Sequence, residues 1–233
     1  MTALFSIVRI ALCAAAIFSL SWPLRAGAMD LTSSAGSFSV PVVSLHEARF
    51  LTVIRQQYDF SCGSAALATL LTHHYQHPVS EQAVFIAMYE NGNKDKIRRE
   101  GFSLLDIKRY LEAHGYRADG YFAPLDMLTG KGIPAIALIN DHGYKHFVVV
   151  KGVSDTQVLV GDPTAGMKII PRKEFEEMWN KLLSVIRNEE KLAVRHFNRA
   201  EEWEVREKAP LEQAISRDGL LSSTLFLPNI YDF

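Results

Sequence analysis

The order of the secondary-structure patterns along the chain limits the folds that it can adopt. Three segments with helical patterns come first, and short strand-like runs separated by turn residues follow, with one more helix among them. Helices are expected at 62–74, 80–90, 103–113 and 171–180, and strands at 133–139, 146–153, 157–160, 167–170 and 182–186. Helices followed by an antiparallel meander predict an α+β fold, with N-terminal helices packed on an antiparallel sheet.

Residues 1–28 have the features of an export signal. Arg9 is the only charged residue before the apolar run 10–18, and Ala-Gly-Ala at 26–28 fits the small-residue signature of signal-peptidase cleavage. The run is shorter than the about 20 apolar residues that span a membrane, and serines and a proline follow it closely. We therefore expect a signal peptide at 1–28 that is cleaved after Ala28. An uncleaved membrane anchor is the alternative.

Composition argues against a nucleic-acid-binding or membrane-embedded protein. Of 25 Lys and Arg residues, Arg9 and Arg25 lie in the expected signal, which leaves 23 basic residues against 26 acidic ones. This balance provides no basic face for nucleic acid. With 48% hydrophobic residues, the chain can bury the core of one compact domain, and no second long apolar segment occurs.

The remainder divides into three parts. Residues 29–49 are rich in Ser, Gly and Thr and then become extended, so we expect a linker that ends in an edge strand. The folded domain is expected at 50–187. Residues 188–233 form an extension that begins with many charged residues. It is either a solvated helix laid against the domain or a segment that docks a partner or substrate.

Cys62 is the only cysteine of the expected mature chain, because Cys13 is removed with the signal. A single thiol in an exported protein cannot form an internal disulfide, which favours a reactive role. Asp59 and Ser61 are possible N-caps that place Cys62 in the first turn of a helix. The free N–H groups and the positive end of the helix dipole favour the thiolate form of a cysteine there. The alternative is a small, buried, structural cysteine.

A cysteine nucleophile requires an imidazole from elsewhere in the chain. His146 opens an apolar strand after a polar turn, which places its ring at the edge of a cleft, and His142 within that turn is the rival. If strands 146–153 and 157–162 form a short hairpin, Asp162 falls beside His146. A carboxylate in that position accepts the second ring N–H and fixes the orientation of the imidazole.

Two glutamines can complete such a site. Gln56 or Gln57 can supply a side-chain amide to an oxyanion hole, together with the backbone N–H of Cys62, and the residues alone leave this choice open. Gly63 removes side-chain bulk where a substrate carbonyl must approach. No metal or cofactor is expected, because the histidines lack a paired thiolate and a helical His-x-x-x-His spacing.

The motifs occur in a specific order: Gln56, Asp59, Cys62-Gly63 before an Ala/Leu helix, then His146-Phe147-Val148-Val149 and Gly161-Asp162-Pro163. This order resembles the bacteriocin-leader-processing (double-glycine) cysteine peptidase family over about residues 50–187. The resemblance implies a papain-like fold with Cys62 as nucleophile, His146 as base, Asp162 as its orienting partner and Gln56 as oxyanion donor. Ser61 stands where family members commonly carry an acidic residue.

No membrane domain or P-loop ATPase follows the peptidase-like region, so the chain resembles a free-standing, exported member of the family. It is similar to the periplasmic peptidases of functional-amyloid secretion in Gram-negative bacteria. The resemblance implies a periplasmic endopeptidase that cleaves secreted or leader-bearing proteins after Gly-Gly or Gly-Ala, in association with an outer-membrane secretion apparatus. The alternatives are a leader-binding, chaperone-like module that does not cleave, and a cell-wall peptide amidase or acyltransferase with the same Cys-His-Asp site.

Overall fold

The computed structural model describes residues 28–33, 36–41, 44–141 and 143–204, which fall into two units. The first unit ends at Ser44 and contains a two-stranded antiparallel sheet of β1 (Ala28–Ser33) and β2 (Gly36–Pro41). The strand expected within 29–49 is thus present as β2, but it pairs with β1 and is not an edge strand of the domain's sheet. The rest of the expected signal peptide and residues 205–233 lie outside the described residues.

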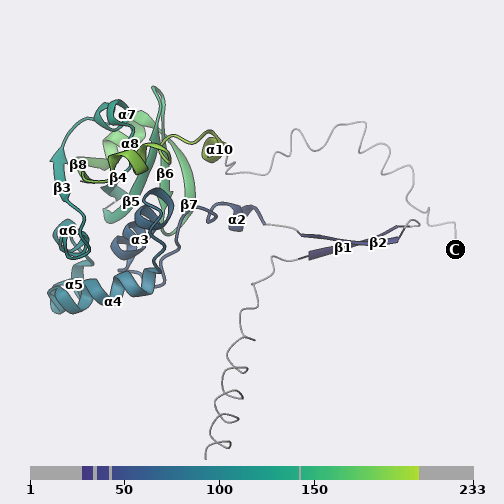
Figure 1. Ribbon diagram of the computed structural model, residues 1–233, viewed down its shortest axis with the longest axis horizontal. Coiled ribbons are helices and arrows are strands. Elements are labelled where there is room, and N and C mark those ends of the chain that lie inside the picture. The colour runs from purple at the N-terminus through teal and green to yellow at the C-terminus, as the bar shows by residue number, and fades with distance from the viewer. Residues whose placement is uncertain (1–27, 34–35, 42–43, 142, 205–233) are drawn as a thin grey trace, which may run out of the picture. The chain divides into compact units, whose positions relative to one another are not determined.

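The second unit begins with a series of helices (Figure 1). In chain order they are α2 (Leu45–Ala48), α3 (Cys62–His74), α4 (Glu81–Asn91), α5 (Lys94–Glu100) and α6 (Leu104–Ala113). The expected helices 62–74, 80–90 and 103–113 are confirmed as α3, α4 and α6. The sequence does not predict α5, because only Ile97 of this charged segment is buried.

Local hydrogen bonds set the starts of two of these helices. Ser80 Oγ accepts from the Ala83 N–H at 3.2 Å and caps α4. Ser103 and Asp106 form a reciprocal capping box at the start of α6. In α3, buried alanines and leucines let the helix pack closely on strand β5, and it also contacts β4 and β6. The sheet therefore fixes the position of the helix that begins with Cys62.

The sheet has six strands in the order β3-β8-β4-β5-β6-β7, and all neighbours are antiparallel. The strands are β3 (Ala118–Phe122), β4 (Ala135–Asp141), β5 (Tyr144–Val153), β6 (Gln157–Asp162), β7 (Gly166–Pro171) and β8 (Trp179–Ile186). The expected meander holds for β4 to β7. It does not hold for β8, which crosses back to lie between β3 and β4. Strand β3, also unexpected, is an edge strand whose Asp119 and Gly120 are unfavourable for β-structure.

Two further helices flank these strands, α7 (Asp126–Lys131) and α8 (Arg172–Met178). Helix α8 is shorter than the expected 171–180, since Pro171 is its N-cap and the chain is extended from Trp179. Trp179 pairs with Ile139 of β4, and its indole N–H donates to the Leu182 carbonyl at 3.0 Å. Sheet pairing and burial of the tryptophan thus override the helical pattern at this point.

Residues 188–204 are packed against the domain. They contain two short helices, α9 (Glu190–Val194) and α10 (Ala200–Trp203), in place of the one solvated helix that the charge pattern predicts. Ala193, Phe197 and Glu202 are buried.

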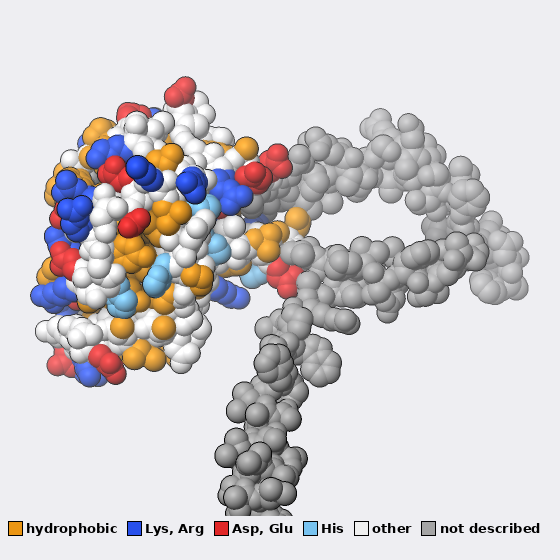
Figure 2. Space-filling view, in the orientation of Figure 1, with side chains coloured by type: hydrophobic (Ala, Val, Ile, Leu, Met, Phe, Trp, Pro, Cys, Tyr) orange, Lys and Arg blue, Asp and Glu red, His pale blue; other side chains and the backbone are white. Residues whose placement is uncertain are grey.

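Basic and acidic side chains are interspersed over the face of the domain seen in Figure 2. Among the residues that the structure describes, no helix is long and apolar enough to cross a membrane.

The turn between β6 and β7 depends on a glycine. Gly166 has φ +78°, and a Cβ there would lie 2.6 Å from the Cβ and carbonyl oxygen of Arg49. Gly166 is also the pairing partner of Asp162, so the turn and the carboxylate are positioned together.

We expect Gly166→Ala to lower the free energy of unfolding by more than about 1 kcal/mol, since both its φ and its surroundings exclude a methyl group. Gly130→Ala is the control, because no atom lies within 4 Å of its added Cβ in α7, and alanine there should stabilise by up to about 1 kcal/mol. Urea unfolding of both variants measures the difference. Equal stability of Gly166→Ala and the native chain would contradict this account of the turn.

Candidate active site

Cys62 is the first residue of α3 and is only 6% exposed. Ser61 is the N-cap residue, as expected, but its side chain does not cap the helix. Its hydroxyl donates to the Tyr58 carbonyl at 2.9 Å and accepts from the Tyr58 N–H at 3.1 Å. Ser61 therefore closes the turn that leads into the helix, and Asp59 is an exposed residue of that turn.

His146 lies near the start of β5 and is 4% exposed. Its Nε2 is 2.8 Å from Oδ1 of Asp162 at the end of β6. Val149 pairs with Gly161, so continuing this register places Asp162 two residues from the position opposite His146. Such diagonal neighbours are within reach of side chains of this length. The hairpin thus brings the two predicted residues together as the sequence predicts.

Asp162 is held by several donors besides the histidine. Its Oδ1 accepts from the backbone N–H and the hydroxyl of Thr164 at 2.8 and 2.6 Å, and Oδ2 pairs with Lys168 Nζ at 3.0 Å. Burial by itself raises the pKa of this carboxyl, but the hydrogen bonds from His146 and Thr164 and the charge of Lys168 hold the pKa well below its usual range. The carboxylate is therefore charged when it orients His146.

The other ring nitrogen of His146, Nδ1, is buried and has no hydrogen-bond partner of normal geometry among the described residues. Burial lowers the pKa of the ring, but this is outweighed by the hydrogen bond to Asp162 and the interaction with the Cys62 side chain, which raise it to about 9. Protonation of His146 therefore stabilises the fold. This contribution is complete below pH 6.5 and is lost as the pH rises through about 9.

Tyr144 stacks on this imidazole and is a site residue that the sequence motifs do not include. Its ring stacks on that of His146 with centroids 5.7 Å apart, and its hydroxyl donates to the Asp59 carbonyl at 3.0 Å. Tyr144 thereby joins β5 to the turn before Cys62. Its position two residues before His146 could have indicated this role, because residues two apart on a strand share a face.

The two glutamines have different environments. The Gln56 backbone N–H donates to the carbonyl of Pro163, the residue after Asp162, at 3.0 Å. Its side-chain Nε2 donates to the Tyr58 carbonyl at 3.0 Å, and its Oε1 is buried. Gln57 is exposed. Of the two, Gln56 is the one tied to the turn that carries Asp162.

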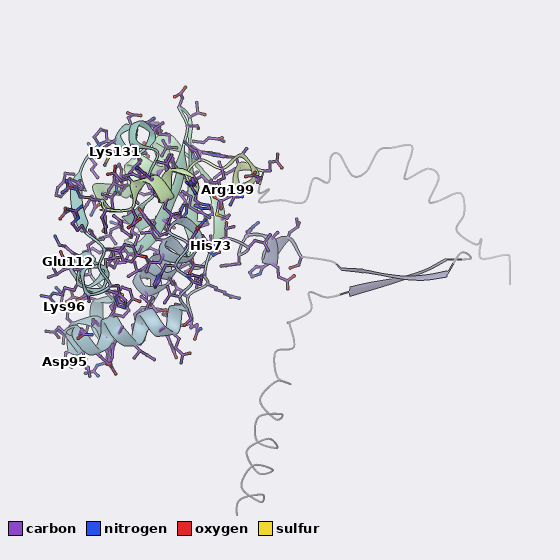
Figure 3. All side chains as sticks on the ribbon, viewed as in Figure 1. His73, Asp95, Lys96, Glu112, Lys131 and Arg199 are labelled. Atoms are coloured by element: carbon purple, nitrogen blue, oxygen red, sulfur yellow. The ribbon has the colours of Figure 1, made fainter. Side chains whose placement is uncertain are left out.

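A cleft of about 750 Å³ opens at Cys62. One wall comes from the α5–α6 connection and the other from the β4–β5 hairpin; its apolar lining consists of Phe60, Phe102, Leu104, Leu105, Leu138, Phe147 and Leu182. Lys96, Arg99 and Lys145 add positive charge, and Figure 3 labels Lys96 on α5. The cleft has a volume and an apolar lining that suit a peptide segment.

Gly63 does not have the role that the sequence suggests. A Cβ at Gly63 would lie 3.0 Å from the Phe102 Cβ and 3.4 Å from the Phe147 ring. The glycine therefore lets two aromatic residues of the cleft approach the turn that carries Cys62, rather than leaving open space for a substrate carbonyl.

The rival histidine, His142, is outside the described residues. His73 and His74 lie at the far end of α3 from Cys62. Within the part of the chain that the structure describes, no group of three or more His, Cys, Asp or Glu side chains is arranged to hold a metal ion.

The sequence pattern of the peptidase C39 family matches residues 51–191. The chain belongs to the peptidase C39 family. It is 40% identical over 172 residues to the probable functional amyloid protease FapD of Pseudomonas fluorescens, covering 73% of this chain and 76% of the relative. Its identity to the protein of the same name from Pseudomonas aeruginosa is 40% over 169 residues, covering 68% and 75% of the two chains.

Among solved structures, the peptidase domain of Streptococcus ComA, a bi-functional ABC transporter, has the same fold. It is 21% identical, with a TM-score of 0.50 over 58% of this chain and 96% of that domain. The expected papain-like α+β fold is confirmed. With its family and its FapD relatives established, this C39 protein is a cysteine peptidase.

We expect the pKa of His146 to be lower in a Cys62→Ala variant than in the native chain, because the interaction with the sulfur is one of the two that raise it. NMR titration of the ring measures both values. The His73 ring is an internal reference, since its pKa is lowered by burial and by Lys151 and should be the same in both proteins. An unchanged His146 pKa would show that the ring and the sulfur do not interact.

Proposed function

We propose that this C39 peptidase is an exported cysteine endopeptidase that cleaves after small residues, at Gly-Gly or Gly-Ala sites, in secreted or leader-bearing proteins. The observation that carries the proposal is the orientation of His146. Its Nε2 is bound to Asp162, while Nδ1 is buried and without such a bond among the described residues, and Cys62 interacts with the ring. This arrangement suits transfer of a proton between the sulfur and the imidazole.

In the proposed reaction, Nδ1 of His146 holds the proton of the Cys62 thiol, in line with the raised pKa of the ring, and the thiolate attacks the peptide carbonyl carbon. The backbone N–H of Cys62 and a side-chain N–H of Gln56 stabilise the oxyanion of the tetrahedral intermediate. As the C–N bond breaks, His146 returns the proton to the leaving amine. Water, deprotonated by His146, then hydrolyses the thioester and frees the sulfur. Asp162 orients the ring and stabilises its charged form throughout.

The cleft and the relatives support a peptide substrate of this kind. Phe102 and Phe147 line the cleft and lie close to Gly63, so large aromatic side chains occupy space next to the proposed nucleophile. Two relatives at 40% identity carry the description functional amyloid protease, which favours a component of such a system as the substrate and its outer-membrane secretion apparatus as the partner. The proposed periplasmic location rests on the export pattern of residues 1–28.

Cys62→Ala and His146→Ala should each abolish cleavage of a peptide that contains a Gly-Gly site, because one lacks the nucleophile and the other the proton carrier. Chromatography of the products measures this. His77→Ala is the control, since His77 is an exposed residue after α3. Cleavage by either variant would refute the assigned roles. Binding without cleavage by the native chain would favour the chaperone-like alternative, and cleavage of peptidoglycan fragments instead would favour the cell-wall enzyme.

The two glutamines provide a second test. Gln56→Ala should lower kcat by about 100- to 1,000-fold, the usual effect of losing one oxyanion donor, with a smaller change in KM. Gln57→Ala, its exposed neighbour, should retain the native kcat. Steady-state kinetics of the two variants on the same peptide compares them. An equal loss in both would remove Gln56 from the proposed oxyanion hole.

A further inference from the structure

Lys151 is a fully buried charged residue that the proposed reaction does not use. It is 0% exposed and lies in β5 where the pairing with β6 shifts between Val150 and Gly152. The strand pairing is irregular at this point, and the lysine side chain is enclosed in the protein. The ammonium donates to the Thr52 carbonyl at 2.9 Å and hydroxyl at 2.8 Å, and it pairs with Glu202 Oε1 at 2.5 Å. All three of its donors are thus used.

Glu202 belongs to residues 188–204, which we call the C-terminal strap. The strap is held to β5 by Asn198, at the end of the strand where β4 no longer pairs with it. The Asn198 N–H donates to the Lys151 carbonyl at 2.9 Å, and the Asn198 side chain accepts from the Val153 N–H at 2.8 Å and donates to the Val153 carbonyl at 3.1 Å. These bonds place α10 and Glu202 next to Lys151.

On the other side of the lysine lies the segment 52–56, which leads to the glutamine of the site. Hydrogen bonds hold this segment at three residues. Thr52 accepts from the Lys151 ammonium, the Ile54 N–H donates to Thr69 Oγ1 of α3 at 2.9 Å, and the Gln56 N–H donates to the Pro163 carbonyl at 3.0 Å. The segment therefore lies between the helix of Cys62 and the turn of Asp162. Only the interaction of Thr52 depends on a residue outside the C39 match, because Lys151 pairs with Glu202 and the match ends at residue 191.

We propose that Lys151 and Glu202 are positioning residues for Gln56. The strap supplies the carboxylate that allows the ammonium to remain buried, and the ammonium fixes Thr52, the start of the segment that carries Gln56. Removal of the carboxylate leaves a buried, uncompensated charge, so the lysine loses its proton or moves toward water, and either change weakens its hold on Thr52. Figure 3 labels Arg199 in the strap and His73 on α3, and both interact electrostatically with Lys151.

The inference rests on the proposed function, and a matched pair of variants tests it. Glu202→Gln should lower kcat on the Gly-Gly peptide by about 10-fold with little change in KM, since displacement of a positioned group slows the chemical step. Glu201→Gln should be unchanged, because Glu201 is exposed and pairs with Arg199. In a Gln56→Ala background, Glu202→Gln should cause no further loss. A loss of the same factor in both backgrounds would overturn the inference.

A second variant separates positioning from stability. In Lys151→Met/Glu202→Met, apolar side chains of similar length replace the buried pair, which often preserves stability but removes both bonds to Thr52. We expect a Tm close to the native value together with a lower kcat. Native kcat in this variant would contradict the proposal.

Hydrogen exchange gives a readout that does not depend on catalysis. Amides of the peptide that covers residues 52–57 should exchange faster in both Glu202→Gln and the double variant, and at the native rate in Glu201→Gln. Native exchange in all three would overturn the positioning role. Retained cleavage in Cys62→Ala would refute the proposed function, and the exchange data would still decide whether the strap holds the segment.

Discussion

The hydrogen bond between His146 and Asp162 is the interaction on which the rest of the site depends. The carboxylate that orients the ring is itself held by Thr164 and by Lys168 within one tight turn. The same turn offers the carbonyl of Pro163 to the Gln56 N–H. One turn therefore positions both the base and the proposed oxyanion donor, so its geometry matters more to the site than that of any single strand.

Local patterns explain how much the sequence could predict. The Ala/Leu composition defines α3, and the capping box of Ser103 and Asp106 defines α6. Both helices begin and end within one residue of their expected bounds. The pairing of His146 with Asp162 also follows from a short connection, because only a few residues separate β5 from β6. Features that depend on interactions between residues close in the sequence can therefore be predicted from the sequence.

Features that depend on distant contacts were not predictable in this way. The insertion of β8 between β3 and β4 pairs residues that are at least forty positions apart, and no local signal specifies it. Lys151 follows three valines in β5, and no local pattern indicates that its ammonium pairs with Glu202. The choice of Gln56 over Gln57 depends on the Pro163 carbonyl, which lies across the fold.

The two buried charge pairs explain why this domain keeps groups that are costly to bury. Neither charge pair is required for a stable core, because apolar residues of similar volume often stabilise a core equally well. Each pair instead fixes loops that have no regular partner: Asp162 accepts hydrogen bonds from five donors in and around its turn, and Lys151 joins the 52–56 segment to the strap. Hydrogen-bonded charges have directional requirements that hydrophobic contacts lack, so they specify the position of an irregular segment. In a site formed by a helix start, a strand and two loops, that specificity is what brings the reacting groups into register.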